Sequence, residues 1–296
     1  MANILVTGSN GQVGTELRHL AKHYPDFQLI GIDVEDLDIT NSNAVYDFIN
    51  KREYHYIINC AAYTAVDQAE SDAEMAYKVN AEGAKNIAQA AVIRNVQMIH
   101  LSTDYVYHNG LERPLLETDA TNPQSVYATT KLQGDQFVQL MLPSSMIIRT
   151  SWVYSSFGHN FVKTMLRLGK EREELKVVAD QIGTPTYARD LAKAILDIIA
   201  LMENDDLVSG AMQGIYHYSN EGTTHWAAFA EAIFRLENIN CKVNPITTAE
   251  YPTPASRPPY SLLDKTKIKN SFGLEIPHWE ESLAHCLELL RARNMG

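Results

Sequence analysis

The chain has 296 residues and is 45% hydrophobic, which is enough for a large core in one or two domains. Its net charge of −11 argues against nucleic acid or an anionic membrane as the main partner. The three cysteines include no CxxC pair, which argues against a disulfide framework or a structural zinc site. The sequence has no signal-peptide pattern and no apolar run of the ~18 residues that span a membrane. We therefore expect a cytoplasmic protein.

The first half of the sequence alternates short apolar runs with helical patterns. The apolar runs predict buried strands at residues 3–7, 27–33, 56–62, 96–103 and 145–151. The helical spacing predicts helices at residues 11–24, 43–51, 73–95 and 127–141. This alternation is typical of an α/β fold, so we expect a Rossmann-type, doubly wound parallel sheet with helices on both faces.

After about residue 150 the alternation becomes less regular. Loops separate helical stretches near residues 160–170, 187–202, 225–237 and 279–293. We expect residues 1–150 to form a dinucleotide-binding domain. Residues 151–296 should form mainly a smaller C-terminal substrate-binding region, with some later segments returning to the first domain.

A glycine pattern, Gly8-x-x-Gly11-x-x-Gly14, stands between the first predicted strand and the first predicted helix. Glycines there allow a sharp turn, a close approach of the backbone to a pyrophosphate and close packing of helix on strand. The N-terminus of the helix offers free N–H groups to phosphates. A glycine turn without a ligand is the alternative, because the spacing differs from GxGxxG.

Asp33 ends the second predicted strand, about 20 residues beyond the glycines, where a carboxylate accepts hydrogen bonds from the adenosine ribose. The same carboxylate repels a 2′-phosphate unless a cation compensates. The next three residues, Val34, Glu35 and Asp36, carry no positive charge. The sequence therefore favours NADH over NADPH.

Tyr127 and Lys131 are four residues apart on a predicted helix and so share one of its faces. A phenol with the usual pKa of about 10 is a poor acid or base at neutral pH, and a nearby ammonium lowers that pKa. Ser102 and Thr103 end the fourth predicted strand at the edge of the sheet where ligands bind. A hydroxyl there can donate a hydrogen bond to a substrate carbonyl oxygen.

These motifs, in this order, resemble the extended form of the short-chain dehydrogenase/reductase family. The stretches "GQVGTEL", "LSTDYVY", "RTSWVY", "DQIGTPT" and "YPTPASRP" are similar, more closely, to the dTDP-4-dehydrorhamnose reductases, and the likeness runs from about residue 3 to 290. It implies an NAD(P)H-dependent oxidoreductase that reduces the C4 ketone of dTDP-4-dehydro-6-deoxy-L-mannose to dTDP-L-rhamnose, the last step of dTDP-rhamnose synthesis.

The resemblance also implies a role for individual residues. Tyr127 would donate the proton, Lys131 would lower the Tyr127 pKa and bind the nicotinamide ribose, and Thr103 would polarise the ketone. Together with Tyr127 and Lys131, the cofactor site would comprise Gly8, Gly11, Gln12, Val13, Gly14, Asp33, Asp38, Ile39, Ala61, Ala62 and Tyr63. The substrate site would comprise Thr103, Asp104, Trp152 and Arg257, with Asn160 and Lys163 as further candidates.

Several points stay open at this stage. The resemblance raises a Mg²⁺ site at a dimer contact through Glu16 and Asp190, although Asp190 is shorter than the glutamate expected there, and both metal and homodimer remain undecided. One alternative function is another nucleotide-sugar enzyme of the extended family, a 4-epimerase or 4,6-dehydratase. The other is a non-catalytic regulatory subunit of the methionine adenosyltransferase type, against which the combination of Thr103, Tyr127 and Lys131 argues.

Overall fold

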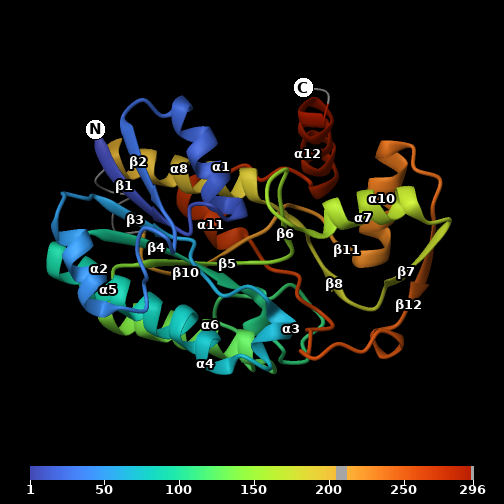
Figure 1. Cartoon of the computed structure of the whole chain (residues 1–296), viewed down its shortest axis with the longest axis horizontal. Coiled ribbons are helices and arrows are strands. Elements are labelled where there is room, and N and C mark those ends of the chain that lie inside the picture. Colours follow the sequence, from blue (N-terminus) through green and yellow to red (C-terminus); the bar gives the residue numbers. More distant parts are fainter. Residues whose placement is uncertain (205–211, 295–296) are drawn as a thin grey trace.

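The computed structural model describes residues 1–204 and 212–294, and its centre is a six-stranded parallel sheet (Figure 1). The strands in spatial order are β2 (Phe27–Ile32), β1 (Ala2–Thr7), β3 (Tyr56–Asn59), β4 (Gln97–Thr103), β5 (Met146–Thr150) and β10 (Gly214–Tyr218). The strand order reverses between β1 and β3. In open α/β sheets this reversal opens a crevice at the carboxyl ends of the strands, where ligands bind.

Helices cover both faces of the sheet, as the sequence predicted (Figure 1). One face carries α1 (Gln12–Leu20), α8 (Ala188–Asn204) and α11 (Thr266–Phe272). The other carries α2 (Ser42–Asn50), α5 (Ala84–Arg94) and α6 (Val126–Met141). Successive strand residues point to opposite faces, so Ile4 and Val6 pack with α1 and α8 while Leu5 packs with α2 and α5.

The first five strands are confirmed, but the sixth, β10, was not predicted. Its sequence, GIYHY, contains a histidine and two tyrosines, so it does not read as a continuous apolar run. It nevertheless pairs along its length with β5, and His217 is fully buried. The polar side chain is accommodated because its ring nitrogen lies 2.8 Å from the Tyr107 hydroxyl.

The helix predicted at residues 73–95 is interrupted. It consists of α4 (Ala73–Tyr77), a π-helical turn (Lys78–Gly83) and α5, and a short helix α3 (Val66–Ala69) precedes it. The turn lies against α6, where a side chain at Gly134 would collide with the Asn80 carbonyl. The π-helical turn therefore lies where its helix closely approaches α6.

The remaining elements form a second, smaller part with its own core, on the right in Figure 1. Its helices are α7 (Phe161–Glu171), α10 (Trp226–Glu237) and α12 (Trp279–Asn294). Its strands pair two by two: β7 (Glu174–Val178) with β12 (Lys242–Ile246), β6 (Val153–Tyr154) with β9 (Thr186–Tyr187), and β8 (Ile182–Gly183) with β11 (Thr224–His225). The chain passes repeatedly between the two parts, because α8, β10 and α11 belong to the sheet.

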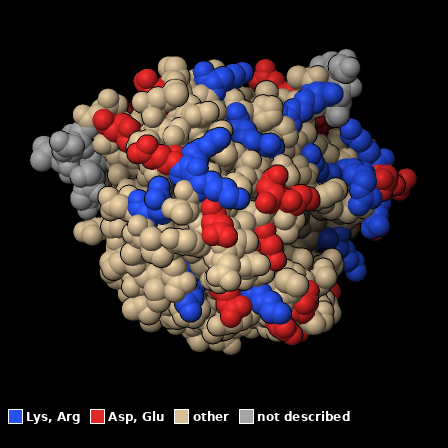
Figure 2. Space-filling view, turned by 60° about the vertical axis from the view of Figure 1, so that its left-hand side comes forward, with Lys and Arg blue, Asp and Glu red and all other residues tan. Residues whose placement is uncertain are grey.

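Charged side chains of both signs are interspersed on the face of the molecule shown in Figure 2, with wide uncharged areas between them. Within residues 1–204 and 212–294, the helices are all too short or too polar to cross a membrane.

Candidate active site

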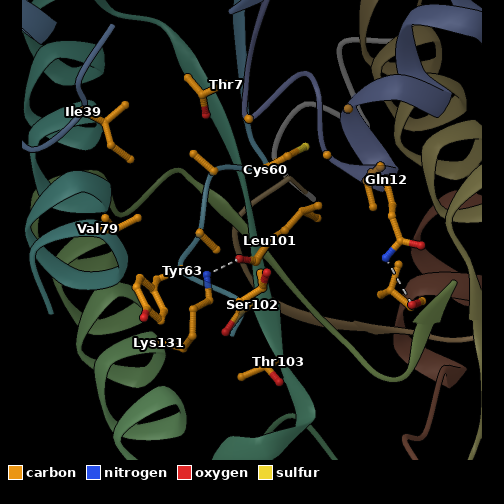
Figure 3. A pocket seen from close by; sticks show the side chains of 18 of the residues that line it. Thr7, Gln12, Ile39, Cys60, Tyr63, Val79, Leu101, Ser102, Thr103 and Lys131 are labelled. Atoms are coloured by element: carbon orange, nitrogen blue, oxygen red, sulfur yellow. Dashed lines mark hydrogen bonds between the residues drawn. The ribbon is translucent and has the colours of Figure 1, made fainter. Parts of the chain in front are cut away.

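A cavity of about 850 Å³ opens at the carboxyl ends of β1, β3 and β4, where the strand order reverses (Figure 3). Its wall contains every residue predicted for the cofactor and for catalysis, and three of the four predicted for the substrate. Arg257 lies outside this lining. The sequence thus identified side chains from six separate segments that the fold brings into one cavity.

The glycine turn after β1 is built for close backbone approach. Gly8 has a φ of +64°, and a Cβ there would lie 2.7 Å from backbone atoms of Ala61 after β3. A Cβ on Gly14 would lie 2.5 Å from the Gly8 carbonyl oxygen. Gly11 is the N-cap of α1 and provides no side-chain cap, so the first N–H groups of the helix are open to an anion. These features fit the pyrophosphate of a dinucleotide.

Asp33 connects the end of β2 to this turn. Its carboxylate accepts hydrogen bonds from the backbone N–H of Asn10 at 2.8 Å and of Val34 at 2.9 Å. A carboxylate has about four acceptor sites, so ribose hydroxyls can still be bound. Further along, Asp38 accepts hydrogen bonds from the N–H and the hydroxyl of Thr40, which fixes the turn that places Ile39 in the cavity wall.

Helix α6 carries both Tyr127 and Lys131. It begins after Ser125, whose hydroxyl accepts a hydrogen bond from the Ala128 N–H. Lys131 is only 2% exposed and donates its Nζ to the Leu101 carbonyl of β4 at 2.7 Å (Figure 3). Burial lowers the pKa of Lys131 to about 8, and the charge of Asp135 opposes this fall.

That Lys131 lowers the Tyr127 pKa stays a prediction, because burial dominates the pKa of this phenol. Burial raises the pKa of Tyr127 to about 12, a hydrogen bond with Thr103 works in the opposite direction, and the charges of Asp104 and Asp135 add to the rise. The Lys131 ammonium is turned toward β4. Tyr127 therefore stays protonated at neutral pH, which is the form that a proton donor needs.

Thr103 ends β4, Asp104 follows it, and both are buried. The Thr103 hydroxyl donates to Asp104 Oδ1 and accepts from the Tyr105 N–H, both at 3.2 Å. Burial raises the pKa of Asp104 to about 7, although hydrogen bonds from Ser261 and Thr103 oppose the rise. Asp104 is therefore a carboxyl group that can change its protonation state near neutral pH while facing the cavity.

Trp152, two residues after β5, has a φ of +47°, which is unusual for a bulky side chain and is typical of functional sites. Its indole stacks on that of Trp226 with ring centroids 3.8 Å apart. The Trp226 N–H in turn donates to Gln181 at 3.1 Å. Sequence reasoning did not find Trp226, because its only signal was an aromatic residue at the start of a predicted helix.

Arg257 forms a two-point ion pair with Asp67 of α3, with N–O distances of 3.0 and 2.7 Å. It also donates to the Thr253 hydroxyl and the Ala255 carbonyl. The guanidinium thus joins the proline-rich segment to the sheet part, and its predicted contact with a diphosphate stays a prediction.

Asn160 and Lys163, the further candidates, lie at the start of α7 and do not line the cavity. Asn160 donates to Gln12 at 2.9 Å, and Lys163 donates to the Gly158 carbonyl at 2.9 Å. Both hold the segment in which Gly158 and His159 contribute to the cavity wall.

Asn80, in the π-helical turn, is a positioning residue that the sequence did not reveal. Its side-chain oxygen accepts a hydrogen bond from the Tyr63 N–H at 2.8 Å, and its amide donates to the Thr130 hydroxyl at 3.1 Å. Asn80 therefore connects the cavity segment Ala61–Tyr63 to α6, the helix that carries Tyr127.

The two carboxylates considered for Mg²⁺ have separate protein partners. Glu16 is fully buried and accepts hydrogen bonds from Ser155 at 2.6 Å and Arg189 at 3.2 Å. Asp190 accepts hydrogen bonds from Asn220 and Ser282. Among the residues that the structure describes, no group of three or more His, Cys, Asp or Glu side chains is arranged to hold a metal ion.

Comparisons with known proteins agree with this geometry. The family described as RmlD substrate binding domain matches residues 1–292. The chain is 42% identical over 290 residues to a dTDP-4-dehydrorhamnose reductase of Aggregatibacter actinomycetemcomitans, covering 96% of this chain and 97% of that relative. It is 43% identical over 289 residues to one of Salmonella typhimurium, covering 94% of each chain.

Solved structures give the same result. A dTDP-4-dehydrorhamnose reductase from Clostridium acetobutylicum superposes with a TM-score of 0.91 at 44% identity, covering 98% of this chain and 99% of that one. One from Bacillus anthracis, in complex with NADP, has a TM-score of 0.91 at 38% identity, covering 97% and 99%. A UDP-glucose 4-epimerase from Thermus thermophilus, at 17% identity and a TM-score of 0.78, shares the fold alone. The chain therefore belongs to the family of the dTDP-4-dehydrorhamnose reductases.

Proposed function

We propose that the protein uses a reduced nicotinamide cofactor to reduce the C4 ketone of dTDP-4-dehydro-β-L-rhamnose to dTDP-L-rhamnose. The observation that carries the proposal is that Thr103, Tyr127 and Lys131 line the same cavity as the glycine turn and Asp33. Groups suited to acid–base chemistry thus lie in one cavity with groups suited to a dinucleotide.

In this proposal each side chain acts on the ketone or holds a group beside it. The reduced cofactor supplies the hydride for C4. Tyr127 donates a proton to the C4 oxygen, and its raised pKa keeps the phenol protonated at neutral pH. The Thr103 hydroxyl, which donates to Asp104 in this structure, turns to donate its hydrogen bond to the same oxygen as negative charge develops there. Lys131 binds the nicotinamide ribose and adds positive charge to this end of the cavity.

The cofactor's pyrophosphate is assigned to the N-terminus of α1, at Gly11 to Val13, and its adenosine ribose to Asp33. Ile39 and the segment Ala61–Tyr63 line the remainder of the cofactor site. We propose a preference for NADH over NADPH, because the Asp33 carboxylate repels a 2′-phosphate and the next three residues carry no cation. The NADP bound to the Bacillus anthracis relative makes this preference a point to measure.

The sugar is assigned to Asp104 and the Trp152 indole, whose apolar face suits the methyl group of a 6-deoxy sugar. The diphosphate is assigned to Arg257, which would exchange part of its ion pair with Asp67 for phosphate oxygens. We accordingly propose that residues 1–150 provide mainly the cofactor site and residues 151–296 mainly the substrate-binding region.

The Mg²⁺ site considered at Glu16 and Asp190 stays a prediction; in the structure both carboxylates accept hydrogen bonds from protein groups. A homodimer and a cytoplasmic location remain predictions, to be tested by light scattering and by cell fractionation.

The test is NADH oxidation by the purified protein with dTDP-4-dehydrorhamnose, with NMR identification of the sugar product. Tyr127→Phe should lower kcat by orders of magnitude while NADH binding persists, because only the proton donor is removed. The matched control is Tyr24→Phe, which removes a hydroxyl bound to Asp197, a partner on α8. Near-normal kcat in Tyr127→Phe would refute the assignment of the acid.

The same assay separates the alternatives. A 4-epimerase or 4,6-dehydratase would purify with bound NAD and convert its sugar without net consumption of NADH. A regulatory subunit would bind NADH without turnover. Either result would replace the proposed reduction.

A further inference from the structure

Behind the wall of the cavity lies a set of buried polar side chains that the proposed reaction does not use. They are His100 of β4, Tyr107, Asp135 of α6 and Arg149 of β5, and each is at most 2% exposed. Charged groups in such surroundings are costly unless they are paired. Their arrangement therefore needs an explanation.

Arg149 and Asp135 form the centre of this set. Arg149 Nε and Nη2 both lie 3.1 Å from Asp135 Oδ2, and Nη1 donates to the Tyr107 hydroxyl at 2.6 Å. Burial raises the pKa of Asp135, and the positive charges of Arg149 and Lys131 oppose that rise. The ion pair with a guanidinium, which cannot lose its proton in proteins, keeps this carboxylate charged.

Lys131 lies one turn before Asp135 on α6, so the two side chains share a face of the helix. The other titratable groups around the Lys131 ammonium carry no negative charge at neutral pH. Burial and Lys131 itself hold the pKa of His100 well below its usual value, so that imidazole is neutral. Burial raises the pKa of Cys60 to about 12 and that of Tyr127 to about 12, so both stay protonated.

Asp135 is thus the anion that compensates the buried Lys131 ammonium within the described part of the chain. Among the charges that act on Lys131, that of Asp135 raises its pKa most. His100 and the Leu101 carbonyl, which are neighbours on β4, contact Asp135 and Lys131 respectively, at 3.7 Å and 2.7 Å. Asp135 and Lys131 therefore both lie against the same segment of β4.

We propose that Asp135, itself held by Arg149, is a positioning residue that keeps Lys131 charged and directed at β4. The Tyr127–Lys131 pair is thereby extended by one helical turn into a three-residue unit. This inference rests on the proposed function for its catalytic consequence but not for its test, because the charge of Lys131 can be measured without substrate.

The test is an NMR titration of the ¹³Cε signals of ¹³C-lysine-labelled protein, with Lys131→Met used to assign the Lys131 signal. Asp135→Asn alone would leave the Arg149 cation buried without its partner, so the main variant is Asp135→Asn/Arg149→Met, which removes both charges. We expect the Lys131 midpoint to fall by about one pH unit or more, because an adjacent opposite charge shifts a pKa by about 1–3 units.

Two further variants are controls. Asp135→Glu keeps the charge and should retain the Lys131 midpoint. Tyr107→Phe removes a different hydrogen bond of Arg149 and should leave the midpoint unchanged. An unchanged midpoint in the double variant, or an equal shift in Tyr107→Phe, would overturn the proposal.

Activity gives an independent measure. Lys131 must be protonated to act, so a lower midpoint should move the alkaline limb of the pH profile of kcat to lower pH by the same amount. A lower NMR midpoint without catalysis of the dTDP-sugar reaction would refute the proposed function and retain the role of Asp135. A shift in NMR without a shift of the kcat profile would refute the link between them.

Discussion

Gly8→Ala tests the idea that the glycine turn exists for close backbone approach. An alanine at φ +64° costs about 1–2 kcal/mol of conformational energy. Its Cβ would also lie 2.7–2.8 Å from backbone atoms of Cys60 and Ala61, and such overpacking costs about 1–3 kcal/mol more. The total loss of stability should therefore be about 2–5 kcal/mol.

Gly273→Ala is the matched control. Gly273 ends α11 with a φ of +63°, and a Cβ there would meet no atom within 4 Å. It should lose only the conformational part, so the two variants should differ by about 1–3 kcal/mol, or roughly 2–12 °C in Tm. Thermal unfolding and NADH titration of both variants give the answer. Equal Tm values would refute the close-approach argument, and so would unimpaired NADH binding by Gly8→Ala.

Three further predictions concern the cofactor, the substrate and the metal. Asp33→Ala should narrow the ratio of kcat/KM for NADH to that for NADPH, and an unchanged ratio would place the discrimination elsewhere. Arg257→Ala should raise the KM for the dTDP-sugar more than the KM for NADH. Asp67→Asn, which weakens the ion pair that competes for Arg257, should lower the KM for the dTDP-sugar. Parallel changes in both KM values would indicate a folding defect. Dialysis against EDTA should leave kcat unchanged, because Glu16 and Asp190 already have protein partners; a loss that Mg²⁺ restores would contradict this.

Much of the fold could be predicted because the signals are local. Short apolar runs that alternate with helical patterns indicate the strands of a parallel sheet, and five strands were found in this way. β10 was missed because its polar residues are satisfied by distant partners, such as Tyr107 for His217. A side-chain contact between residues more than a hundred positions apart cannot be predicted from a short stretch of sequence.

In the site, too, local signals could be read from the sequence and contacts between distant residues could not. That Tyr127, Lys131 and Thr103 line one cavity could be predicted, because the chemistry that suggested them depends on residue type and spacing. The side chains that position them could not, because Asn80 acts through a π-helical turn and Arg149 through a buried ion pair. The raised pKa of Tyr127 could not be predicted either, since it depends mainly on burial, which residue spacing does not reveal.

The return of α8, β10 and α11 to the sheet has a consequence for synthesis of the chain. The sheet face that carries Ile4 and Val6 is covered mainly by α8, and its far edge is completed only by β10. A nascent chain that has emerged only as far as β5 therefore exposes an apolar face and an unpaired strand edge, both of which favour aggregation. The first 150 residues should consequently be insoluble when expressed alone, and the full chain should fold cooperatively only after α11 has left the ribosome.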